Sequence, residues 1–425
     1  MAEFSRPRGT ADILPEQIPQ WLKVEQKARE IFSLYHFQEI RTPIFEHTEV
    51  FERGVGDTTD IVQKEMYTFR DRADRSITLR PEGTAGVVRA FVEAKMYGGP
   101  LPVKLFYLGP MFRYEAPQAG RFRQLHQYGV EVIGADDPRV DAEVIELADR
   151  YLSSVGAKAR LEINSVGCPV CRARHKEALL EHLLPVKHEL CADCQGRMEK
   201  NPLRILDCKK DADHPVVASS PLLLDYLCDD CKSHFDSVLM YLDQLDLDYE
   251  VNPRLVRGLD YYTKTAFEFI DERIGAKSTI LGGGRYNGLI NMLGGPEVPG
   301  IGFAGGVERL LLSRKEAGIA EQNSDAIDVY VVAMGNEAKT ASVKVLKDLR
   351  DHLISADADY TNRGLKAQMK TADRLQAKAA ILIGDDELAQ GAYAVRNLHD
   401  KTQELVKVEQ ISSYLLGLLG KVDHE

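Results

Sequence analysis

Residues 257–262, Arg-Gly-Leu-Asp-Tyr-Tyr, place a cation, an acid and two phenols directly before the apolar stretch TAFEFI, which is typical of a strand. The glycine at 258 allows the backbone to approach a ligand closely. Polar groups of this kind are costly to bury beside an apolar strand unless something pairs with them. The segment indicates either a ligand site or a buried structural ion pair, and by itself it does not decide between the two.

A second polar set follows one face of the stretch 125–134, LHQYGVEVIG, which reads as a strand. Side-chain alternation puts Gln127, Gly129 and Glu131 on one face of that strand. The glycine is expected to leave room for a ligand between the amide and the carboxylate. The alternative is the solvent-facing polar side of an antiparallel sheet, which is a common arrangement.

Four arginines could together hold a polyphosphate. Arg113 lies near the end of the β-rich stretch 103–115, and Arg121 lies in the charged loop that follows. Arg257 belongs to the segment 257–262. Arg309 lies in a helix that follows the glycine-rich GIGFAGG. Guanidinium groups suit phosphates because their donors form a rigid fork. No Gly-x-x-x-x-Gly-Lys-Ser/Thr segment occurs, so a nucleotide is not expected in a P-loop.

The seven cysteines form three Cys-x-x-Cys pairs and one single residue, and all of them fall between residues 165 and 247. Two such pairs about twenty residues apart are typical of a zinc site. The sequence predicts one structural Zn²⁺ on Cys168, Cys171, Cys191 and Cys194, with Cys228 and Cys231 as the alternative second pair. The other possibility is reduced thiols without metal.

Periodicity predicts the elements that position these residues. Apolar residues recur at helical spacing from 16 to 36, and SITLR at 76–80 reads as a strand that leads into a helix. The stretches 103–115 and 125–134 are expected to form an antiparallel hairpin. Asp137 and Pro138 supply a cap and a first-turn proline for the next helix.

The cysteine-rich region 165–247 differs in style from its surroundings and reads as an inserted helical module, apart in sequence from every residue with expected chemistry. Strand-rich, glycine-rich sequence resumes at 249 and runs to 312. A polar linker then precedes a separate α/β unit. In that unit Lys366, Lys370 and Arg374 recur every four residues along a helix, which taken alone is typical of a solvated face.

Length and charge limit the protein class. The chain has 425 residues, enough for about three domains. The net charge of −11 argues against a non-specific DNA-coating protein but leaves a local basic patch possible. Apolar runs are too short to cross a bilayer, and the N-terminus lacks the apolar core of a signal peptide. We therefore expect a cytoplasmic protein without a membrane partner.

Six segments, which follow one another along the chain in the expected order, resemble the histidyl-tRNA synthetases, a family of class II aminoacyl-tRNA synthetases. The resemblance covers essentially the whole chain. IRTPIFEHTEVFERGVGD resembles the dimer-forming class II motif 1, FYLGPMFRYEAPQAGRFRQLHQYGVE resembles motif 2, and GIGFAGGVERLLL resembles motif 3. TLRPEGTAG, LVRGLDYY and GGGRYNGL resemble segments of the histidine enzymes specifically. The resemblance implies an α+β fold with a class II antiparallel sheet, a helical insertion and a C-terminal α/β anticodon-binding domain.

The implied domains are a catalytic domain at 1–325, with the module 165–247 inserted, and an anticodon-binding domain at 326–425. The implied partners are L-histidine, ATP with Mg²⁺, the histidine tRNA and a second copy of the chain in a homodimer. In this context the face of Lys366, Lys370 and Arg374 is expected to contact tRNA phosphates. A structural Zn²⁺ would be an addition to these.

The resemblance also implies roles for single residues. Arg113 would contact the α-phosphate and the histidine carboxylate, Arg121 and Arg309 would lie near the β- and γ-phosphates, and Arg257 would stabilise charge at the α-phosphate. Arg113, Arg257 and Arg309 are thus the expected catalytic residues. The expected histidine-binding residues are Glu82, Gly83, Thr84, Arg113, Gln127, Glu131, Arg257, Tyr261, Tyr262 and Tyr286. In this set Glu82, Thr84 and Gln127 would hold the amino group, and Glu131 and Tyr262 would bind the imidazole nitrogens.

Two rival interpretations belong to other classes of protein. Synthetase-like proteins serve as regulatory subunits of ATP phosphoribosyltransferase, but they usually lack the C-terminal domain and lose catalytic residues. This sequence retains Arg257, Arg309 and residues 327–411. An RNA-binding protein with a zinc module would explain the cysteines, but it would leave the arginines without a purpose.

Overall fold

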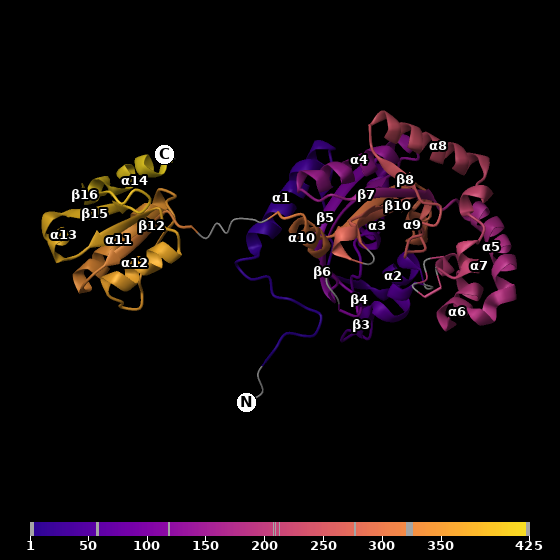
Figure 1. Cartoon of the computed structure of the whole chain (residues 1–425), viewed down its shortest axis with the longest axis horizontal. Coiled ribbons are helices and arrows are strands. Elements are labelled where there is room, and N and C mark those ends of the chain that lie inside the picture. Colours follow the sequence, from indigo (N-terminus) through magenta and orange to yellow (C-terminus); the bar gives the residue numbers. More distant parts are fainter. Residues whose placement is uncertain are drawn as a thin grey trace. The chain divides into compact units, whose positions relative to one another are not determined.

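A computed structural model of the chain describes residues 4–56, 59–117, 120–206, 208, 210–211, 213–275, 278–319 and 326–421. The chain divides into two compact units, Met1–Glu321 and Gln322–Glu425 (Figure 1). The expected boundary at 325/326 lies outside the described residues. Within the described ranges no helix is both long enough and apolar enough to cross a membrane.

The first unit is built on an eight-stranded sheet with the order β1-β5-β6-β11-β10-β9-β7-β8. The six central strands are antiparallel, and each edge strand pairs in parallel with its neighbour. This confirms the antiparallel class II core. In sheet order the strands are β1 Gln38–Glu39, β5 Val103–Phe112, β6 Gln124–Ile133, β11 Gly300–Gly306, β10 Thr279–Arg285, β9 Thr263–Ile270, β7 Arg160–Ser165 and β8 Tyr249–Val251.

Helices cover one face of this sheet and form the main hydrophobic core. They are α1 (Ile18–Leu34), α4 (Pro138–Ser154), α8 (Asp229–Gln244) and α10 (Val307–Glu316), of which α4 and α8 run side by side (Figure 1). The predicted start of α4 is confirmed, since the Asp137 side chain accepts a hydrogen bond from the Arg139 N–H at 2.9 Å. Such a cap satisfies a backbone donor that the helix itself cannot.

The register of β6 decides which of its side chains meet this core. Tyr128, Val130 and Val132 are fully buried against the helices. Because side chains alternate along a strand, Gln127 and Glu131 point to the opposite face. The predicted separation of β6 into an apolar and a polar face is therefore confirmed, and the polar face is buried as well.

The first unit also contains a smaller antiparallel sheet of three strands. Its order is β2-β4-β3, with β2 at Phe45–His47, β4 at Ser76–Leu79 and β3 at Tyr67–Arg70. The strand β4 leads into α3 (Thr84–Glu93), as the sequence predicted. The other short helices of this region are α2 (Thr48–Val55) and α9 (Leu289–Met292).

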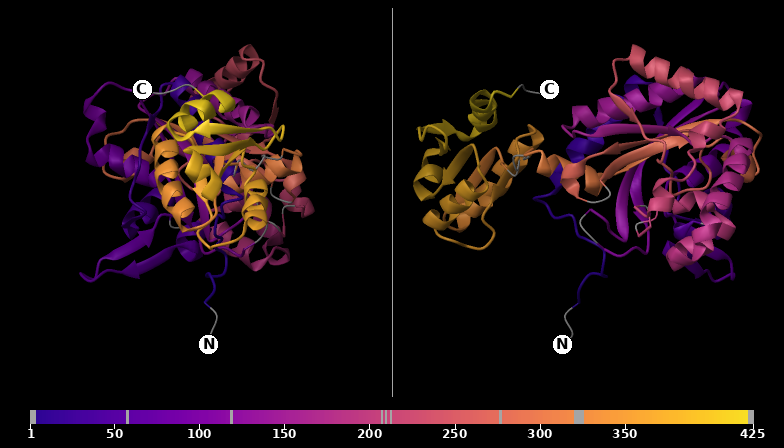
Figure 2. Two further views of the ribbon diagram at one scale, coloured as in Figure 1. Left: turned by 90° about the vertical axis from the view of Figure 1, so that its left-hand side faces the viewer. Right: turned by 45° about the vertical axis from the view of Figure 1, so that its right-hand side comes forward.

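The inserted region is more closely joined to the sheet than its sequence predicted. Helices α5 (Pro169–Leu183), α6 (Ala192–Lys200) and α7 (Pro215–Ala218) gather at one end of the unit around a small core of their own (Figures 1 and 2). The last predicted module helix, α8, belongs to the main core, because Phe235, Val238 and Leu242 pack beneath α4. The part with a separate core therefore runs only from Leu179 to Val217.

The second unit is a five-stranded sheet covered by helices around its own core. Its sheet order is β13-β12-β14-β15-β16, parallel across the first three strands and antiparallel across the last two. The predicted α/β pattern is confirmed. The elements are β12 Val329–Ala333, α11 Asn336–Asp351, β13 Ala356–Ala358, α12 Leu365–Arg374, β14 Ala379–Ile383, α13 Asp385–Gln390, β15 Ala392–Asn397, β16 Gln403–Lys407 and α14 Ile411–Leu419.

Candidate functional site

A polar cavity of about 770 Å³ lies in the first unit, against the sheet face to which Gln127 points. Strands β6, β9, β10 and β11 contribute to its lining, together with the segment 252–262. Most of the residues that the sequence singled out meet here. Those that line the cavity are Glu82, Thr84, Arg113, Arg121, Gln127, Arg257, Tyr261, Tyr262 and Arg309. The structure thus brings together residues more than 220 positions apart in the chain.

Glu131 lies behind this lining with its carboxyl group almost completely buried, at 1% exposure. The Tyr286 hydroxyl donates to Glu131 Oε2 at 2.5 Å, and Oε1 has no hydrogen-bond partner among the described residues. The side chain fits because it lies across from Gly302 on β11, where a Cβ atom would clash with the carboxylate. Burial raises the pKa of Glu131 to about 8. The site therefore favours a neutral carboxyl group at Glu131, which a bound cation or N–H donor would help to ionise.

Glu82 and Gln127 offer acceptors to the same cavity. The two carboxylate oxygens of Glu82 accept from the backbone N–H groups of Thr84 and Ala85, both at 2.8 Å, at the start of α3. Burial raises the pKa of Glu82 in spite of these bonds. Gln127 Oε1 is buried and has no partner among the described residues. A carboxylate and an unpaired carbonyl oxygen at one site suit an ammonium group.

Arg257 is held across the sheet by a partner that the sequence did not reveal. Its Nη1 donates to the Glu268 carboxylate on β9, and the second Glu268 oxygen accepts from Thr279 Oγ1 at 2.6 Å. A Cβ atom at Gly282 would clash with the Arg257 guanidinium, so a glycine is needed at this point of β10. Burial alone would lower the pKa of Arg257, but the Glu268 carboxylate together with the hydroxyl groups of Tyr262 and Tyr261 outweighs it, and the pKa is raised. The arginine is a fixed, permanent cation.

Three further arginines form a second group of cations. Arg113 Nε donates to the Pro81 carbonyl at 2.8 Å, and Arg121 Nη1 lies 3.4 Å from Glu115 Oε2. Burial, and then the charge of Arg121, lower the pKa of Arg309. A cation whose pKa is lowered by a neighbouring cation is stabilised by an anion. Arg113 lies one residue beyond β5, so the prediction that it is a strand residue is wrong.

One prediction about space in the site is wrong. The gap beside Gly129 does not admit a ligand, because the Tyr107 ring fills it and would clash with a Cβ atom there. Tyr107 faces Gly129 across the β5–β6 pair, and the same ring also occupies the space beside Gly83. The two glycines therefore allow a buried tyrosine to lie between strand and helix. Glycine is often taken to mark a ligand, but here it marks close packing.

The tyrosines of the segment 257–262 lie together with Tyr286. All three are nearly fully buried. The ring centroids of Tyr261 and Tyr262 are 4.7 Å apart, and those of Tyr261 and Tyr286 are 5.8 Å apart. Arg257 Cζ lies 5.5 Å from the centroid of the Tyr262 ring. The aromatic cluster thus joins the buried carboxyl group of Glu131 to the fixed cation.

The inserted module supplies another part of the cavity wall, which the sequence did not predict. Arg197, Arg204 and Lys210 line the cavity. Both arginines lie 3.7 Å from the Asp60 carboxylate on the opposite wall. In addition Arg204 Nη1 donates to the Gly258 carbonyl at 3.2 Å. The module is distant from the site in sequence but contacts it directly in space.

The cysteines form two groups. The predicted grouping of Cys168, Cys171, Cys191 and Cys194 around one ion is wrong, and the alternative second pair, Cys228 and Cys231, is the one that lies with Cys168 and Cys171. In each group the candidate ligand atoms all lie within 4.8 Å of one another. The regrouping follows from the fold, because α5 and α8 meet at the base of the module whereas α6 lies farther along it. The first group is Cys168, Cys171, Cys228 and Cys231, and the second is Cys191, Cys194, Cys208 and Asp211.

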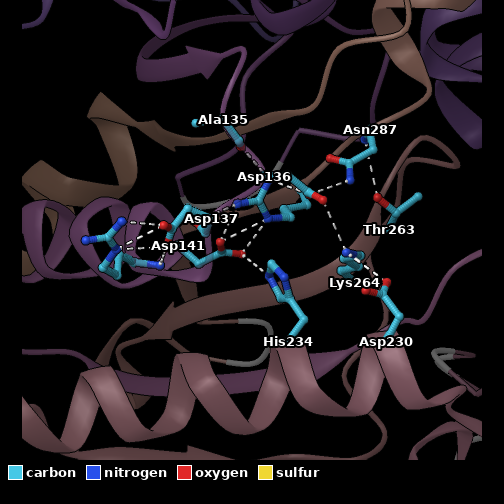
Figure 3. Close-up of polar contacts among 11 residues, drawn as sticks. Ala135, Asp136, Asp137, Asp141, Asp230, His234, Thr263, Lys264 and Asn287 are labelled. Atoms are coloured by element: carbon cyan, nitrogen blue, oxygen red, sulfur yellow. Dashed lines mark hydrogen bonds and ion pairs between the residues drawn. The ribbon is translucent and has the colours of Figure 1, made fainter.

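A buried ion-pair network surrounds the end of β10 and so supports the site (Figure 3). Arg285, the arginine of the GGGRYNGL segment, is fully buried, and its Nη2 lies 2.6 Å from Asp141 Oδ2 on α4. His234 on α8 lies 3.2 Å from the other oxygen of Asp141 (Figure 3). Arg285 also donates to the carbonyls of Ala135 and Asp137. A fully paired buried charge fixes the end of β10, from which Tyr286 follows.

The basic face predicted for the second unit is present on α12. Lys366, Lys370 and Arg374 are all exposed along this helix. Lys378, just beyond it, is also exposed, but its Nζ lies 2.9 Å from Asp328 Oδ1. The three helix residues therefore offer cations to an external partner, while Lys378 already has a carboxylate.

Comparison with known proteins agrees with this geometry. The chain matches the sequence family described as histidyl-tRNA synthetase over residues 9–182 and 199–310, and the anticodon binding domain over 328–418. It is 56% identical to the histidine–tRNA ligase of Geobacillus sp. (strain WCH70), across 97% of this chain and 98% of that protein. It is 54% identical to the histidine–tRNA ligase of Anoxybacillus flavithermus, across 98% and 99% of the two chains.

Solved structures show the same likeness. The apo histidyl-tRNA synthetase of S. aureus superposes with a TM-score of 0.82 at 44% identity, across 97% of this chain and all of that one. A Bacillus halodurans protein described as an ATP phosphoribosyltransferase regulatory subunit/histidyl-tRNA synthetase matches at 19% identity and a TM-score of 0.60, which shows the fold alone. The close relatives are ligases, so the alternative of a regulatory subunit is not supported. The chain belongs to the histidyl-tRNA synthetase family.

Proposed function

We propose that the cavity of the first unit joins histidine to ATP and passes the histidyl group to the 3′ end of the histidine tRNA. This is the AMP-forming ligase reaction of the family. The observation that carries the proposal is one cavity that the four predicted arginines line and that has a buried carboxyl–phenol pair behind its lining. The buried pair suits an imidazole ring, and the arginines suit a triphosphate.

At the amino-acid end, Glu131 and Tyr262 bind the imidazole nitrogens. The unpaired Glu131 Oε1 accepts an imidazole N–H, and this bond favours the ionised carboxylate. Tyr261 and Tyr286 enclose the ring, and Tyr286 also holds Glu131 in place. A buried acceptor of this kind rejects side chains without a donor, because it would then stay unpaired.

The amino group of histidine binds Glu82, Thr84 and Gln127, while Gly83 makes room for Tyr107 at the start of α3. Glu82 and Gln127 both provide acceptors on the cavity wall. Arg113 then receives the histidine carboxylate. This set leaves the carboxylate pointing toward the second group of arginines.

At the nucleotide end, Arg121 and Arg309 bind the β- and γ-phosphates and Arg113 the α-phosphate. Mg²⁺ comes with ATP, and its preferred ligands are carboxylate and phosphate oxygens. Glu65 and Glu115 line the cavity and fit this need, since burial and the Glu115 charge raise the pKa of Glu65. These two residues would hold Mg²⁺, which supplies charge neutralisation to the phosphates.

In the first step a histidine carboxylate oxygen attacks the α-phosphorus, and pyrophosphate leaves. Negative charge builds on the α-phosphate and the leaving group, so fixed cations lower the barrier. Arg257 is suited to this task because Glu268 already holds it in position. Positioning and preformed charge then supply most of the acceleration.

Lys366, Lys370 and Arg374 of the second unit contact phosphates of the tRNA. Sequence-independent contacts of this kind set the orientation of the RNA. The reaction takes place where tRNA and ATP meet, so the cytoplasm is the expected location.

The homodimer is supported by exposed apolar residues in the motif 1 region. Phe45 is 57% exposed and Phe69 is 48% exposed, on the β2-β4-β3 sheet, and Ile44 beside them is 45% exposed. Large apolar side chains that gather on one surface are typical of an interface. Sedimentation of a Phe45→Ser, Phe69→Ser variant should show a monomer where the unchanged chain shows a dimer. A dimeric variant would place the interface elsewhere.

The deciding experiment is exchange of labelled pyrophosphate into ATP with each of the twenty amino acids in turn. We expect exchange with histidine alone. Exchange that does not depend on any added amino acid, or that prefers another one, would refute the assignment of Glu131 and Tyr262 to imidazole.

A further inference from the structure

The sulfur spacing in the two cysteine groups is that of thiolates around a single metal ion. Cys168 Sγ lies 3.6 Å from Cys171 Sγ and 3.9 Å from Cys228 Sγ. In the second group Cys191 Sγ lies 3.8 Å from Cys208 Sγ. Thiolates that each lie about 2.3 Å from one tetrahedral zinc ion are about 3.8 Å apart. The three observed sulfur–sulfur separations are close to this value, and they lie on both sides of it.

Each Cys-x-x-Cys pair is also held in the way that metal sites require. Cys168, Cys191 and Cys228 are the residues that precede α5, α6 and α8, and their partners lie in the first turns of the same helices. Helix N-termini favour negative charge, which stabilises thiolates. Two backbone N–H groups also donate to sulfur, from Cys228 to Cys171 at 3.1 Å and from Lys210 to Cys208 at 3.4 Å.

Other states of the cysteines fit less well. The sulfur separations given above are far longer than the roughly 2.05 Å of a disulfide bond, and all seven cysteines are free. An iron–sulfur cluster distributes its four thiolates over two or more irons, so sulfurs on different irons lie farther apart than the limit of 4.8 Å that holds for every pair here.

We propose that the chain binds two structural zinc ions, one on Cys168, Cys171, Cys228 and Cys231 and one on Cys191, Cys194, Cys208 and Asp211. Together the two sites use every cysteine of the chain. Asp211 is buried and supplies the fourth ligand, and its Oδ2 accepts from the Cys191 N–H at 2.9 Å. Three thiolates and one carboxylate are an acceptable zinc shell.

The two ions have different tasks. The first joins the entry and exit of the insertion, because Cys168 follows β7 and Cys228 begins α8. The second lies where the module meets the cavity, since Cys208, Lys210 and Asp193 all belong to the cavity lining. It therefore fixes the wall that carries Arg204. The second task rests on the proposed function, whereas the presence of metal does not.

The direct test is the zinc content of the full-length protein purified without chelator, measured by elemental analysis. We expect about two equivalents per chain. The paired variants Cys228→Ser, Cys231→Ser and Cys191→Ser, Cys208→Ser should each retain about one. If the unchanged chain holds only one equivalent of zinc, one site is wrong, namely the site whose paired variant does not change the zinc content. Less than one equivalent would overturn both sites.

A second measurement tests the two sites even if the cysteine variants fail to fold. The unchanged chain is stripped of metal under reducing conditions and loaded with Co²⁺, whose spectrum reports tetrahedral thiolate ligation. Asp211→Cys should keep two ions and strengthen the sulfur-to-cobalt band. Asp211→Ala should lose one ion, while Asp213→Ala, an exposed neighbour, should keep both. An Asp211→Ala variant with two tightly bound ions would refute the second site.

Pyrophosphate exchange separates this inference from the proposed function. Loss of the second ion should raise the KM for ATP several-fold and leave the preference for histidine unchanged. If two ions are present but exchange is unaffected by Asp211→Ala, the metal sites stand and the task of the second one is wrong. If no amino acid supports exchange in the unchanged chain, the proposed function fails although the metal count can still be correct.

Discussion

The two walls of the cavity are built in different ways. On the sheet wall Arg257 is held by Glu268 on β9, and Glu131 on β6 is held by Tyr286. On the module wall Arg204 and Arg197 reach Asp60 at 3.7 Å, and the helices behind them have only a small core. The sheet wall is therefore preorganised by the register of long strands, whereas the module wall depends on local clamps.

This difference indicates a division of labour. Groups that stabilise a transition state must not move, and a sheet with two packed faces provides such positions. A small helical module has little apolar area to bury, so metal ligation would supply the stability that its core cannot. Substitutions on the sheet wall should thus have large effects, on the rate of chemistry or on histidine binding, and those on the module wall should cause only a modest loss of ATP binding.

The largest effect is expected for Arg257→Ala. The kcat of histidine-dependent pyrophosphate exchange should fall by about a hundredfold or more, because a fixed cation near the α-phosphate is lost. Arg160→Ala is the matched control, since Arg160 is on β7 of the same sheet but outside the cavity. If kcat is unchanged and only the KM for histidine rises, Arg257 binds substrate and the sheet wall loses its special role.

Glu131→Gln should have the next largest effect, on histidine rather than ATP. Loss of a hydrogen bond to a charged group costs about 1.5–3 kcal/mol, which corresponds to a rise in the histidine KM of roughly tenfold or more. The KM for ATP should stay the same. Steady-state exchange at varied histidine and ATP gives both constants, and equal increases in the two would contradict a separate imidazole site.

The same variant also tests the buried state of Glu131. The pKa of Glu131 in the folded protein is about 8, against 4.5 for an ordinary glutamate, so the native state retains a proton that the unfolded state loses. The contribution of this group to the free energy of unfolding is complete below about pH 4.5 and is lost as the pH rises toward 8. Glu131→Gln should remove this part of the decline. Urea unfolding of both proteins without ligand, between pH 5 and 9, measures the difference.

A smaller effect is expected on the module wall. Arg204→Ala should raise the KM for ATP about two- to fivefold with little change in kcat, since a partly exposed ion pair is worth up to about 1 kcal/mol. Arg174→Ala serves as the control, because Arg174 is an exposed arginine on α5 of the same module and lies outside the cavity. A hundredfold loss of kcat in Arg204→Ala would place the module among the catalytic elements and remove the contrast between the walls.

The smallest effect on exchange, namely none, is expected for charge reversal on α12. Lys366→Glu with Lys370→Glu should leave pyrophosphate exchange unchanged but raise the KM for tRNA, and the salt dependence of charging should fall by about one unit of slope for each lost phosphate contact. Lys344→Glu with Lys347→Glu, two exposed residues on α11, is the control with the same change in net charge. Normal tRNA affinity in the double variant would show that this helix face is only a solvated surface.

Periodicity in the sequence was enough to locate the elements. The apolar stripe of α1, the cap of α4 and the alternation in β6 all depend on neighbours a few positions apart, and local geometry repeats at that range. Resemblance to the family then gathered Arg113, Arg257 and Arg309 into one site, and the cavity confirms that they meet.

Contacts between distant segments were decided only by the tertiary structure. No local pattern marks Glu268 as the partner of Arg257, or Tyr107 as the ring that fills the space beside Gly129, because both depend on which strands pair and in what register. The cysteines show the same limit. Spacing identified each Cys-x-x-Cys pair correctly, since both members lie within one helical turn. Which pairs share a site depended on where the helices meet, and that is a property of the packed fold.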